Sequence, residues 1–381
     1  MRRHLFDADH EAFRSTIRDY LVREVVPAFP QWLEAGQVPR SFIVDMGKLG
    51  VLGLNIDERY GGSGPASYLY SMVLAEETAR ALVHSGPLRA HTDVVLPYFL
   101  QFCTDEQRDR WFPGFAGGDL FTAIAMTEPG TGSDLAGVRT RAVRDGDHFV
   151  LNGAKTFITG GILADLVIVV ARTSDEADRR RGLSLLVVED GMPGFAKGRK
   201  LDKMGLRVQD TAELSFSDVR VSADNLLGEE GAAFDYLRHN LAGERVSAAV
   251  GSLTAAHAAL TVTVDYVNGR RVFGERLGSF QNTKFELAGV ATELEAAQAL
   301  LDRAVLEYDR GELSGADAAK VKLYCSEVQG RTVDRCLQLF GGYGYMTEYP
   351  IARLYADARV SRIYAGTSEV LKTIIAKDLG L

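Results

Sequence analysis

The chain has 381 residues and a formal net charge of −8 at pH 7, with 46% hydrophobic and 25% charged residues. This length exceeds what one hydrophobic core usually supports, so we expect two or three domains. The acidic balance excludes nucleic-acid binding as a main activity, because such proteins need clustered lysine and arginine. The composition also excludes a largely disordered chain.

The three cysteines, Cys103, Cys325 and Cys336, are an odd number without Cys-x-x-Cys spacing. They predict reduced thiols, with neither a disulfide framework nor a zinc site, so we expect no metal and a cytoplasmic protein. The first residues lack the apolar stretch of a signal peptide. No apolar run approaches the ~18 residues that span a bilayer, so no membrane span is expected.

Residues 1–118 predict an N-terminal α-helical domain. Apolar residues recur at helical spacing, as at Phe13, Ile17 and Leu21. Pro27 is expected to end this first run, because proline disrupts a helix interior.

Residues 119–228 predict a middle β domain. Short runs rich in Val, Ile, Phe and Thr alternate with turn residues. The predicted strands are 149–159, 166–170, 183–188 and 212–216. Asp145-Gly146-Asp147 has the composition of a tight hairpin turn, and most strands lack a helix-length connection. We therefore expect antiparallel pairing.

Residues 229–381 predict a C-terminal four-helix bundle. The first helix carries one apolar stripe, which comprises Val246, Ala249, Val250, Leu253, Leu260, Val264 and Val267. Further helices are predicted at 283–309, 316–340 and 369–377, with Gly311 and Gly341-Gly342 as stops. The fold class is therefore α+β, with a helical domain, an antiparallel β domain and a helical bundle in that order.

The segment Ala125-Met126-Thr127-Glu128-Pro129-Gly130-Thr131-Gly132-Ser133-Asp134 stands out. Proline and glycine leave backbone N–H groups free, and these could cradle an anion or a ring carbonyl. Taken alone, such a composition indicates a plain surface turn.

Six segments in the same order resemble the acyl-CoA dehydrogenase family. They are residues 125–134, 152–159, 203–211, 270–274, 338–344 and 363–369, which together span most of the chain. A Gly-x-Gly-x-x-Gly fingerprint is missing, because Leu135 stands where the third glycine would fall. The resemblance implies the three-domain fold above and a bound FAD that is not held in a Rossmann cradle.

The resemblance also implies which residues contact the flavin ring. Met126 and Thr127, with Ser133 close by, would contact its polar edge. One face would be backed by Phe157, Ile158 and Thr159, with Thr159 near N5.

The rest of FAD would involve the C-terminal part. In the family, residues equivalent to Arg270, Phe273 and Gln281 reach FAD across a subunit interface. Gln338, Gly341 and Gly342 would accompany the pyrophosphate and adenosine. Thr367 and Glu369 begin the last helix, where free N–H groups suit phosphate or ribose oxygens. The resemblance therefore implies a homo-oligomer, either a dimer or a tetramer.

One departure from the family concerns the catalytic base. Most relatives have a glutamate immediately before Gly366-Thr367, but this chain has Ala365. The long-chain and isovaleryl types share that loss and carry a glutamate before an arginine on the first bundle helix. Glu244-Arg245 stands at that position. A single Glu-Arg pair indicates a solvated helix residue, but together with Ala365 it predicts Glu244 as the base.

Glu244 would take the α proton while the β hydride passes to flavin N5. The backbone N–H of Ala365 and a ribityl hydroxyl of FAD would stabilise the enolate oxygen. An apolar pocket would raise the pKa of Glu244 towards neutrality. The residues implied at the substrate are Ser133, Arg245, Tyr364, Ala365 and Gly366, with Arg245 beside CoA.

The acyl group is less constrained. The helix around residues 86–91 is expected to border the acyl tail, and Arg89 and His91 are polar for a hydrocarbon channel. This favours a shorter or functionalised acyl group, although both side chains pointing to solvent is an equally good interpretation. Ala242 replaces an aspartate that some relatives use near the substrate, so an acyl carrier protein thioester remains an alternative to acyl-CoA.

Three other functions fit the same fold. They are a flavin monooxygenase, an acyl-CoA oxidase, whose chains are usually longer, and a non-catalytic acyl-CoA-binding protein that would have lost its FAD ligands. By resemblance, the expected electron acceptor is an electron-transferring flavoprotein.

Overall fold

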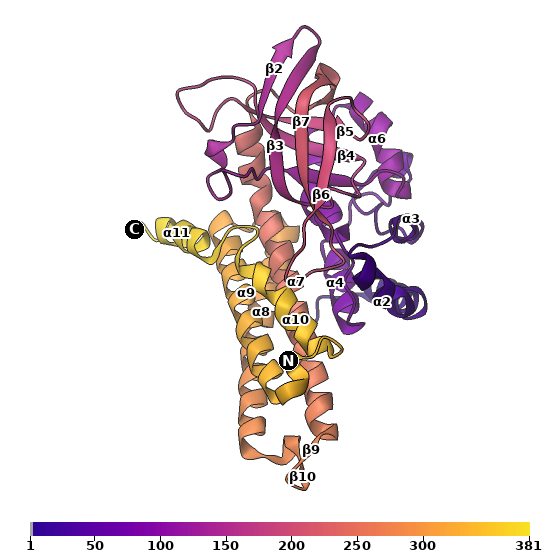
Figure 1. The fold of residues 1–381 in the computed structure, drawn as a ribbon, viewed down its shortest axis with the longest axis vertical. Coiled ribbons are helices and arrows are strands. Elements are labelled where there is room, and N and C mark those ends of the chain that lie inside the picture. Colours follow the sequence, from indigo (N-terminus) through magenta and orange to yellow (C-terminus); the bar gives the residue numbers. More distant parts are fainter. Residues whose placement is uncertain (1–2) are drawn as a thin grey trace.

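The computed structural model describes residues 3–381, and it has three parts that follow one another along the chain (Figure 1). The first part is helical, as predicted. Its helices are α1 (Ala8–Tyr20), α2 (Val26–Ala35), α3 (Arg40–Lys48), α4 (Leu69–Arg80), α5 (Leu96–Phe102) and α6 (Asp105–Gly117). The predicted boundaries at residues 118 and 228 remain predictions.

The prediction that Pro27 ends the first helical run is wrong. A π-helical turn at Leu21–Val25 connects α1 to α2, and Pro27 lies in the first turn of α2. The wider π-helical turn directly before Pro27, in which Val26 N–H donates to the Leu21 carbonyl, accommodates a residue that has no N–H. The chain therefore stays helical through this proline.

The second part is a mainly antiparallel sheet with the strand order β6-β7-β3-β2-β4-β5-β8. Its strands are β1 (Thr122–Ala125), β2 (Arg141–Asp145), β3 (His148–Thr159), β4 (Leu166–Arg172), β5 (Leu183–Glu189), β6 (Phe195–Lys200), β7 (Thr211–Ser222) and β8 (Leu226–Leu227). The predicted hairpin is confirmed, since Asp145 pairs with His148. Two contacts depart from antiparallel pairing: β1 runs parallel to β4, and β2 meets β4 at one parallel position.

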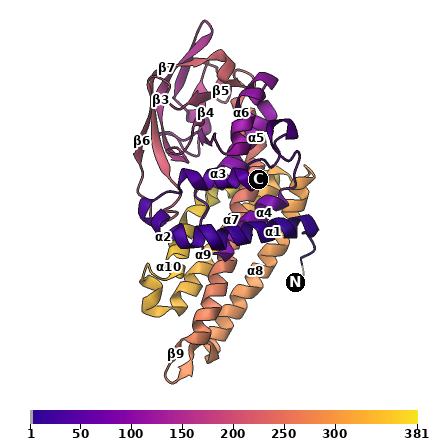
Figure 2. The same ribbon diagram turned by 90° about the vertical axis from the view of Figure 1, so that its right-hand side faces the viewer.

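The third part is built on three long helices that lie side by side in Figures 1 and 2. These are α7 (Ala233–Gly269), α8 (Gln281–Asp309) and α9 (Gly315–Leu339), followed by α10 (Pro350–Ala358) and α11 (Ser368–Asp378). A small hairpin of β9 (Arg271–Val272) and β10 (Glu275–Arg276) joins α7 to α8 at the end farthest from the sheet.

Two predictions for the bundle need correction. The helix α10, which packs on α7 and α9, was not predicted, and the predicted last helix α11 packs on α9. Val264, placed on the apolar stripe, is 37% exposed although Thr263 and Val267 are buried, so it lies on the side of α7 that faces away from the core. The others in the stripe are buried or partly buried.

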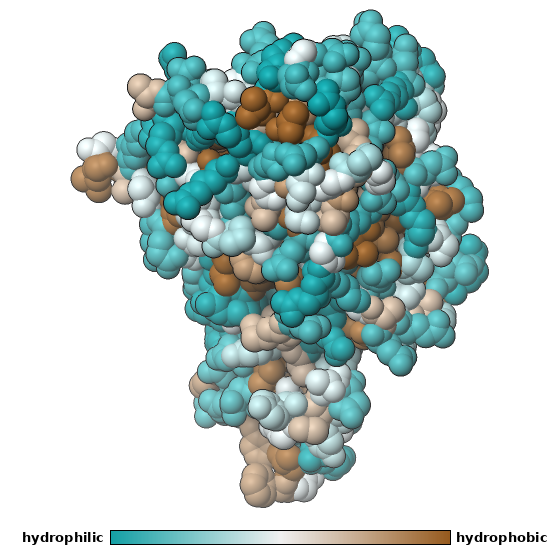
Figure 3. Space-filling view, turned by 45° about the horizontal axis from the view of Figure 1, so that its top comes forward, coloured by the Kyte–Doolittle hydropathy of each residue, from teal (hydrophilic) through white to brown (hydrophobic). Residues whose placement is uncertain are grey.

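The hydrophobic cores join the three parts. One core connects α5 and α6 to β4 and β5, and another connects α4 to the bundle helices. The helix α7 is apolar and long enough to cross a bilayer, but 61% of its most apolar stretch is buried within the fold, as in a core helix. The three cysteines are buried free thiols. The face drawn in Figure 3 is mainly hydrophilic, with separate apolar patches.

Candidate active site

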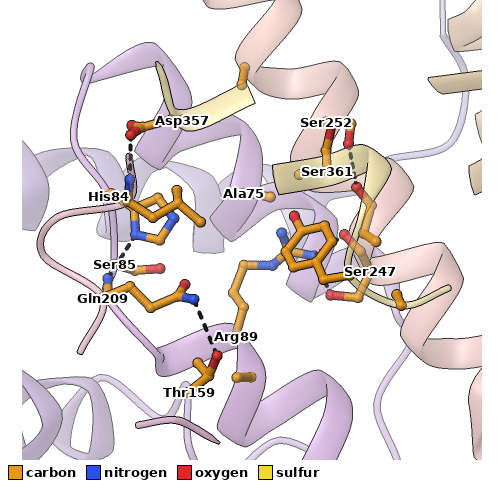
Figure 4. A pocket seen from close by; sticks show the side chains of 18 of the residues that line it. Ala75, His84, Ser85, Arg89, Thr159, Gln209, Ser247, Ser252, Asp357 and Ser361 are labelled. Carbon is orange, nitrogen blue, oxygen red and sulfur yellow. Dashed lines mark hydrogen bonds between the residues drawn. The ribbon is translucent and has the colours of Figure 1, made fainter. Parts of the chain in front are cut away.

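A cavity of about 350 Å³ lies where the three parts meet. It is lined by residues of α4, α7 and α10, by the segment 82–90, by β3 and by residues 361–365. Figure 4 shows side chains from these separate segments turned towards one space. A pocket of this size at a domain junction is a common location for a ligand site.

Glu244 lies in this cavity, on the face of α7 that also presents Ser247, Ala248 and Gly251. This spacing of three to four residues puts all of them on one side of the helix. The glutamate is 9% exposed, and its Oε1 accepts a hydrogen bond of 3.1 Å from the hydroxyl of buried Tyr98. Burial raises the pKa of Glu244 to about 7, although the Tyr98 hydrogen bond and Arg245 act in the opposite direction.

Ala365 and Tyr364 line the same cavity as Glu244. Ala365 has a left-handed backbone with φ of 51°. The next carbonyl, that of Gly366, accepts a hydrogen bond of 2.7 Å from Lys322 Nζ. Lys322 is fully buried, and burial lowers its pKa to about 8. This lysine therefore fixes the peptide next to Ala365.

Sequence reasoning missed Lys322 and Tyr98. A lysine among the apolar positions of α9 was a usable signal for the first. Nothing in the sequence distinguishes Tyr98 from an ordinary core tyrosine.

The predicted flavin-ring residues gather at one edge of the cavity, whose lining includes Met126, Thr127, Phe157, Ile158 and Thr159. Thr156 N–H donates to the Thr127 carbonyl at 2.9 Å, which joins the two segments. Lys155 Nζ lies 2.9 Å from both the Met126 carbonyl and Glu128 Oε1, and both side chains are buried. This ion pair holds the segment after β1 against β3.

Phe157 is placed so that its side chain could pack against a ring of a bound ligand. It has φ of 60° within β3, next to a register shift between Lys155 and Ile158, and it is 66% exposed. A large aromatic side chain held out at a cavity edge offers a flat apolar surface. The residues present therefore fit one end of an isoalloxazine ring. Ser133 is exposed and outside the cavity lining.

Arg245 points away from Glu244 into a second hollow of about 1,120 Å³. Its Nη1 donates to the Gly315 carbonyl at 3.2 Å. Arg180, Arg238 and Lys377 line the same hollow, and with Arg245 they outnumber its acidic side chains, Asp235 and Asp378. These cationic side chains fit a ligand with phosphate groups.

The remaining predicted FAD residues lie elsewhere on this chain. A third hollow of about 730 Å³, at the bundle end beside β9, is lined by Arg270, Phe273, Gln338, Gly341 and Gly342. Phe273 is 97% exposed, and Gln281 is also exposed. Side chains added at Gly341 or Gly342 would meet open space. Thr367 and Glu369 begin α11, where the Thr367 hydroxyl caps Val370 N–H at 3.3 Å. Within one chain, the residues of this third hollow therefore lie apart from the flavin-ring residues.

The interpretation that Arg89 and His91 point to solvent is wrong. His91 is fully buried, its Nδ1 lies 2.7 Å from Thr122 Oγ1, and its ring stacks on Phe121. It is outside the cavity lining, so it does not border the acyl tail, whereas Arg89 does line the cavity. Burial lowers the pKa of His91 to about 3, which keeps it neutral.

Three domain families match nearly the whole chain. Residues 7–119 match the acyl-CoA dehydrogenase N-terminal domain, 123–219 the middle domain and 231–380 the C-terminal domain. The chain is 43% identical over 378 residues to the mitochondrial long-chain specific acyl-CoA dehydrogenase of Sus scrofa. The aligned region covers 99% of this chain and 88% of the relative.

Comparison with solved structures points to the same family. A crystal structure of an acyl-CoA dehydrogenase from Geobacillus kaustophilus superposes with a TM-score of 0.97 at 45% identity, over 100% of both chains. A glutaryl-CoA dehydrogenase from Mycobacterium smegmatis in complex with FADH2 superposes with a TM-score of 0.89 at 30% identity, over 98% of this chain and 95% of the other. The chain therefore belongs to the acyl-CoA dehydrogenase family of FAD-dependent oxidoreductases, which dehydrogenate acyl-CoA substrates.

Proposed function

We propose that this protein removes two hydrogens across the α and β carbons of an acyl-CoA to give the trans-2-enoyl-CoA, with Glu244 as the base. The observation that carries the proposal is a buried carboxyl group, with its pKa raised to about 7, in the cavity that also holds the flavin-ring residues. When bound, FAD supplies the hydride acceptor for the β carbon.

Glu244 is suited to take the α proton near neutral pH. A base whose pKa lies close to the working pH is ionised often enough to act and still basic enough to accept a proton. The Tyr98 hydroxyl donates to Oε1 at 3.1 Å and so orients the carboxylate. Burial excludes water that would otherwise compete for the same position.

The Ala365 N–H is the proposed donor to the thioester oxygen. Negative charge develops on this oxygen as the α proton leaves, so a fixed N–H donor stabilises the transition state. Lys322 supports that role by holding the adjacent Gly366 carbonyl at 2.7 Å. A missing side chain at position 365 leaves this backbone donor in place.

The cationic hollow around Arg245 supports free CoA rather than a carrier protein. Coenzyme A carries more phosphate groups than the phosphopantetheine arm of a carrier, and Arg180, Arg238 and Lys377 offer charge for them. The buried Glu244 also favours dehydrogenation over a flavin monooxygenase, which would not need this base. An acyl-CoA oxidase would use the same base and differs in that O2 reoxidises its reduced flavin.

The exposed bundle-end residues support an assembly in which the cofactor is shared. Arg270, Phe273 and Gln281 would complete the FAD site of a second copy of this chain, in a dimer or a tetramer. An electron-transferring flavoprotein is the proposed reoxidant.

The test is anaerobic reduction of the bound flavin by a panel of acyl-CoAs, followed at its absorbance band. Glu244→Gln should slow reduction by about 10²–10⁴-fold while the flavin stays bound. Glu229→Gln, at an exposed position, is the matched control and should reduce as the wild type does. Reduction of the Glu244→Gln flavin at the wild-type rate would refute the assignment of the base.

A further inference from the structure

The acyl side of the cavity contains a charged group that a hydrocarbon chain would leave unsatisfied. The Arg89 side chain is 16% exposed, and in Figure 4 it extends across the cavity towards Ser247 of α7. Ser247 lies about one helical turn after Glu244. The guanidinium therefore lies within reach of a chain whose α carbon is at Glu244.

Arg89 uses only part of its donors. Its Nη2 donates to Asp93 Oδ2 at 2.9 Å, to Ser247 Oγ at 2.9 Å and to the Ser247 carbonyl at 3.1 Å. Its Nε is buried without a partner among the described residues. Its Nη1 faces Gly251, where an added Cβ would lie 3.1 Å away. Nη2 also donates to the Tyr68 hydroxyl at 3.4 Å, whereas Nη1 has no acceptor among the described residues, so its two N–H groups remain for a ligand.

The charge of Arg89 is already balanced. Asp93 pairs with it and is 3% exposed. The Asp93 carboxylate also accepts from Ser247 Oγ at 2.8 Å, from Ser71 Oγ at 2.6 Å and from Thr92 Oγ1 at 2.9 Å. A ligand carboxylate would therefore become a second anion on one guanidinium, close to Glu244, which must itself ionise. A neutral oxygen avoids this repulsion and still accepts from the free N–H groups.

The cavity contains a second unsatisfied group. Gln329 lines it, is 4% exposed and has a buried side-chain oxygen without a partner among the described residues. A purely alkyl chain would exclude water from these polar groups and would not replace the hydrogen bonds that they make with water. Leaving a buried charged donor unpaired costs about tenfold or more in affinity.

We propose that the acyl chain carries a hydroxyl or carbonyl oxygen that accepts a hydrogen bond from Arg89. This inference rests on the proposed dehydrogenase function and names its substrate class. The span along α7 from Glu244 to the stretch between Ser247 and Gly251 is about 5–10 Å, which places the oxygen roughly four to eight carbon–carbon bonds beyond the α carbon.

The test compares acyl-CoAs of one chain length in three forms: unsubstituted, with a hydroxyl or oxo group at that distance, and with a carboxylate there. Anaerobic flavin reduction should show kcat/KM at least about tenfold higher for the hydroxyl or oxo form than for the unsubstituted one. Equal or faster reduction by the unsubstituted chain overturns the inference. Fastest reduction by the carboxylate overturns the choice of a neutral group.

A paired variant separates Arg89 from general damage to the fold. Arg89→Met with Asp93→Asn removes both charges together, so no buried ion is left alone. The preference for the oxygenated chain should disappear, with the unsubstituted chain gaining rate. Ser252→Ala is the control, because the Ser252 hydroxyl also lines the cavity but donates to the Ala248 carbonyl at 2.8 Å, and the preference should persist. Thermal unfolding of each variant checks the fold.

Binding distinguishes failure of this inference from failure of the dehydrogenase proposal. If no acyl-CoA reduces the flavin, the proposed function fails. The shift of the flavin absorbance band on binding then still ranks the three forms. Tighter binding of the oxygenated form, lost in the paired variant, supports the Arg89 site, and equal binding of all three overturns it.

Discussion

The cavity around Glu244 and the hollow at the bundle end differ in how much of each site one chain provides. In and beside the cavity, Glu244 and Lys322 are buried, Arg89 is 16% exposed, and all three hold hydrogen bonds within the chain. At the bundle end, Phe273 is 97% exposed and the Arg270 guanidinium lies over the ring of Tyr343, at 5.2 Å. The buried polar groups of the first site all come from one chain, whereas the second has the features of half a site.

This difference separates two kinds of effect. Buried groups in the cavity have their protonation states set by the fold, so changes there should alter chemistry and pH dependence. Exposed groups at the bundle end interact with little in their own chain, so changes there should alter cofactor retention and assembly. The predictions below test this division, from the largest expected effect to the smallest.

The largest effect concerns stability. The folded pKa of Glu244 is about 7, against 4.5 for an unperturbed glutamate. Below pH 4.5, Glu244 is protonated in both the folded and the unfolded protein and has no effect on stability. Between pH 4.5 and about 7, it ionises in the unfolded protein first, so the free energy of unfolding falls as the pH rises. Glu244→Gln removes this loss and should be more stable than wild type by up to about 3 kcal/mol above pH 7, with no gain at low pH.

Denaturant unfolding at a series of pH values measures this gap. Glu229→Gln, at an exposed site, should show no gap at any pH. A Glu244→Gln gain that is the same at low and high pH would mean that the buried carboxyl does not titrate in this range.

The next effect concerns the position of the base. Adding Ala365→Glu to Glu244→Gln places a carboxyl at another position that lines the same cavity. Flavin reduction should recover by about ten- to a hundredfold over the single variant, a part of the contribution of a general base. No recovery, with substrate still bound, would mean that the residue 365 side chain does not reach the α carbon.

The bundle end provides the contrasting test. Phe273→Ser should lower FAD affinity by about tenfold and shift the protein towards smaller assemblies, because a large apolar contact with a partner is lost. Flavin retention on dilution and sedimentation velocity measure both. Val143→Ser is the control, since Val143 is also exposed, at 52%, but lies in the sheet. Unchanged FAD affinity and assembly in Phe273→Ser would remove the case for a shared site.

The same contrast explains what the sequence could predict. Periodicity and turn residues were enough for the three parts and for the hairpin at Asp145-Gly146-Asp147, because these depend on local pattern. The helix α10 was missed because it is only 9 residues long, which is too short for a clear helical period in the sequence. Its burial comes from packing on α7 and α9, which no local pattern reveals.

The candidate site was likewise predictable from local motifs but not where it depends on distant contacts. Linked motifs identified Glu244 and the flavin-ring segment, and the structure brings them to one cavity. The directions of Arg89 and His91 could not be read from the sequence, because their partners Ser247 and Thr122 lie 158 and 31 residues away. Whether a polar residue faces a cavity, a core or solvent depends on such distant contacts.

The smallest effect tests the pKa of Glu244 itself. The Tyr98 hydrogen bond favours the ionised carboxylate, so Tyr98→Phe should raise the pKa of Glu244 further. One lost hydrogen bond corresponds to roughly half a unit to one unit. The pH midpoint of flavin reduction, near 7 in the wild type, should move upwards by that amount, with reduction slower at pH 7 and unchanged at high pH.

Tyr60→Phe is the matched control. Its hydroxyl donates to Asp109 at 2.8 Å, outside the catalytic cavity, so the midpoint should not move. A midpoint that falls in Tyr98→Phe would mean that the titrating group is not Glu244. An upward shift confined to Tyr98→Phe would tie the pH dependence to one buried carboxyl, which is the behaviour expected when the titrating group and its hydrogen-bond donor belong to the same chain.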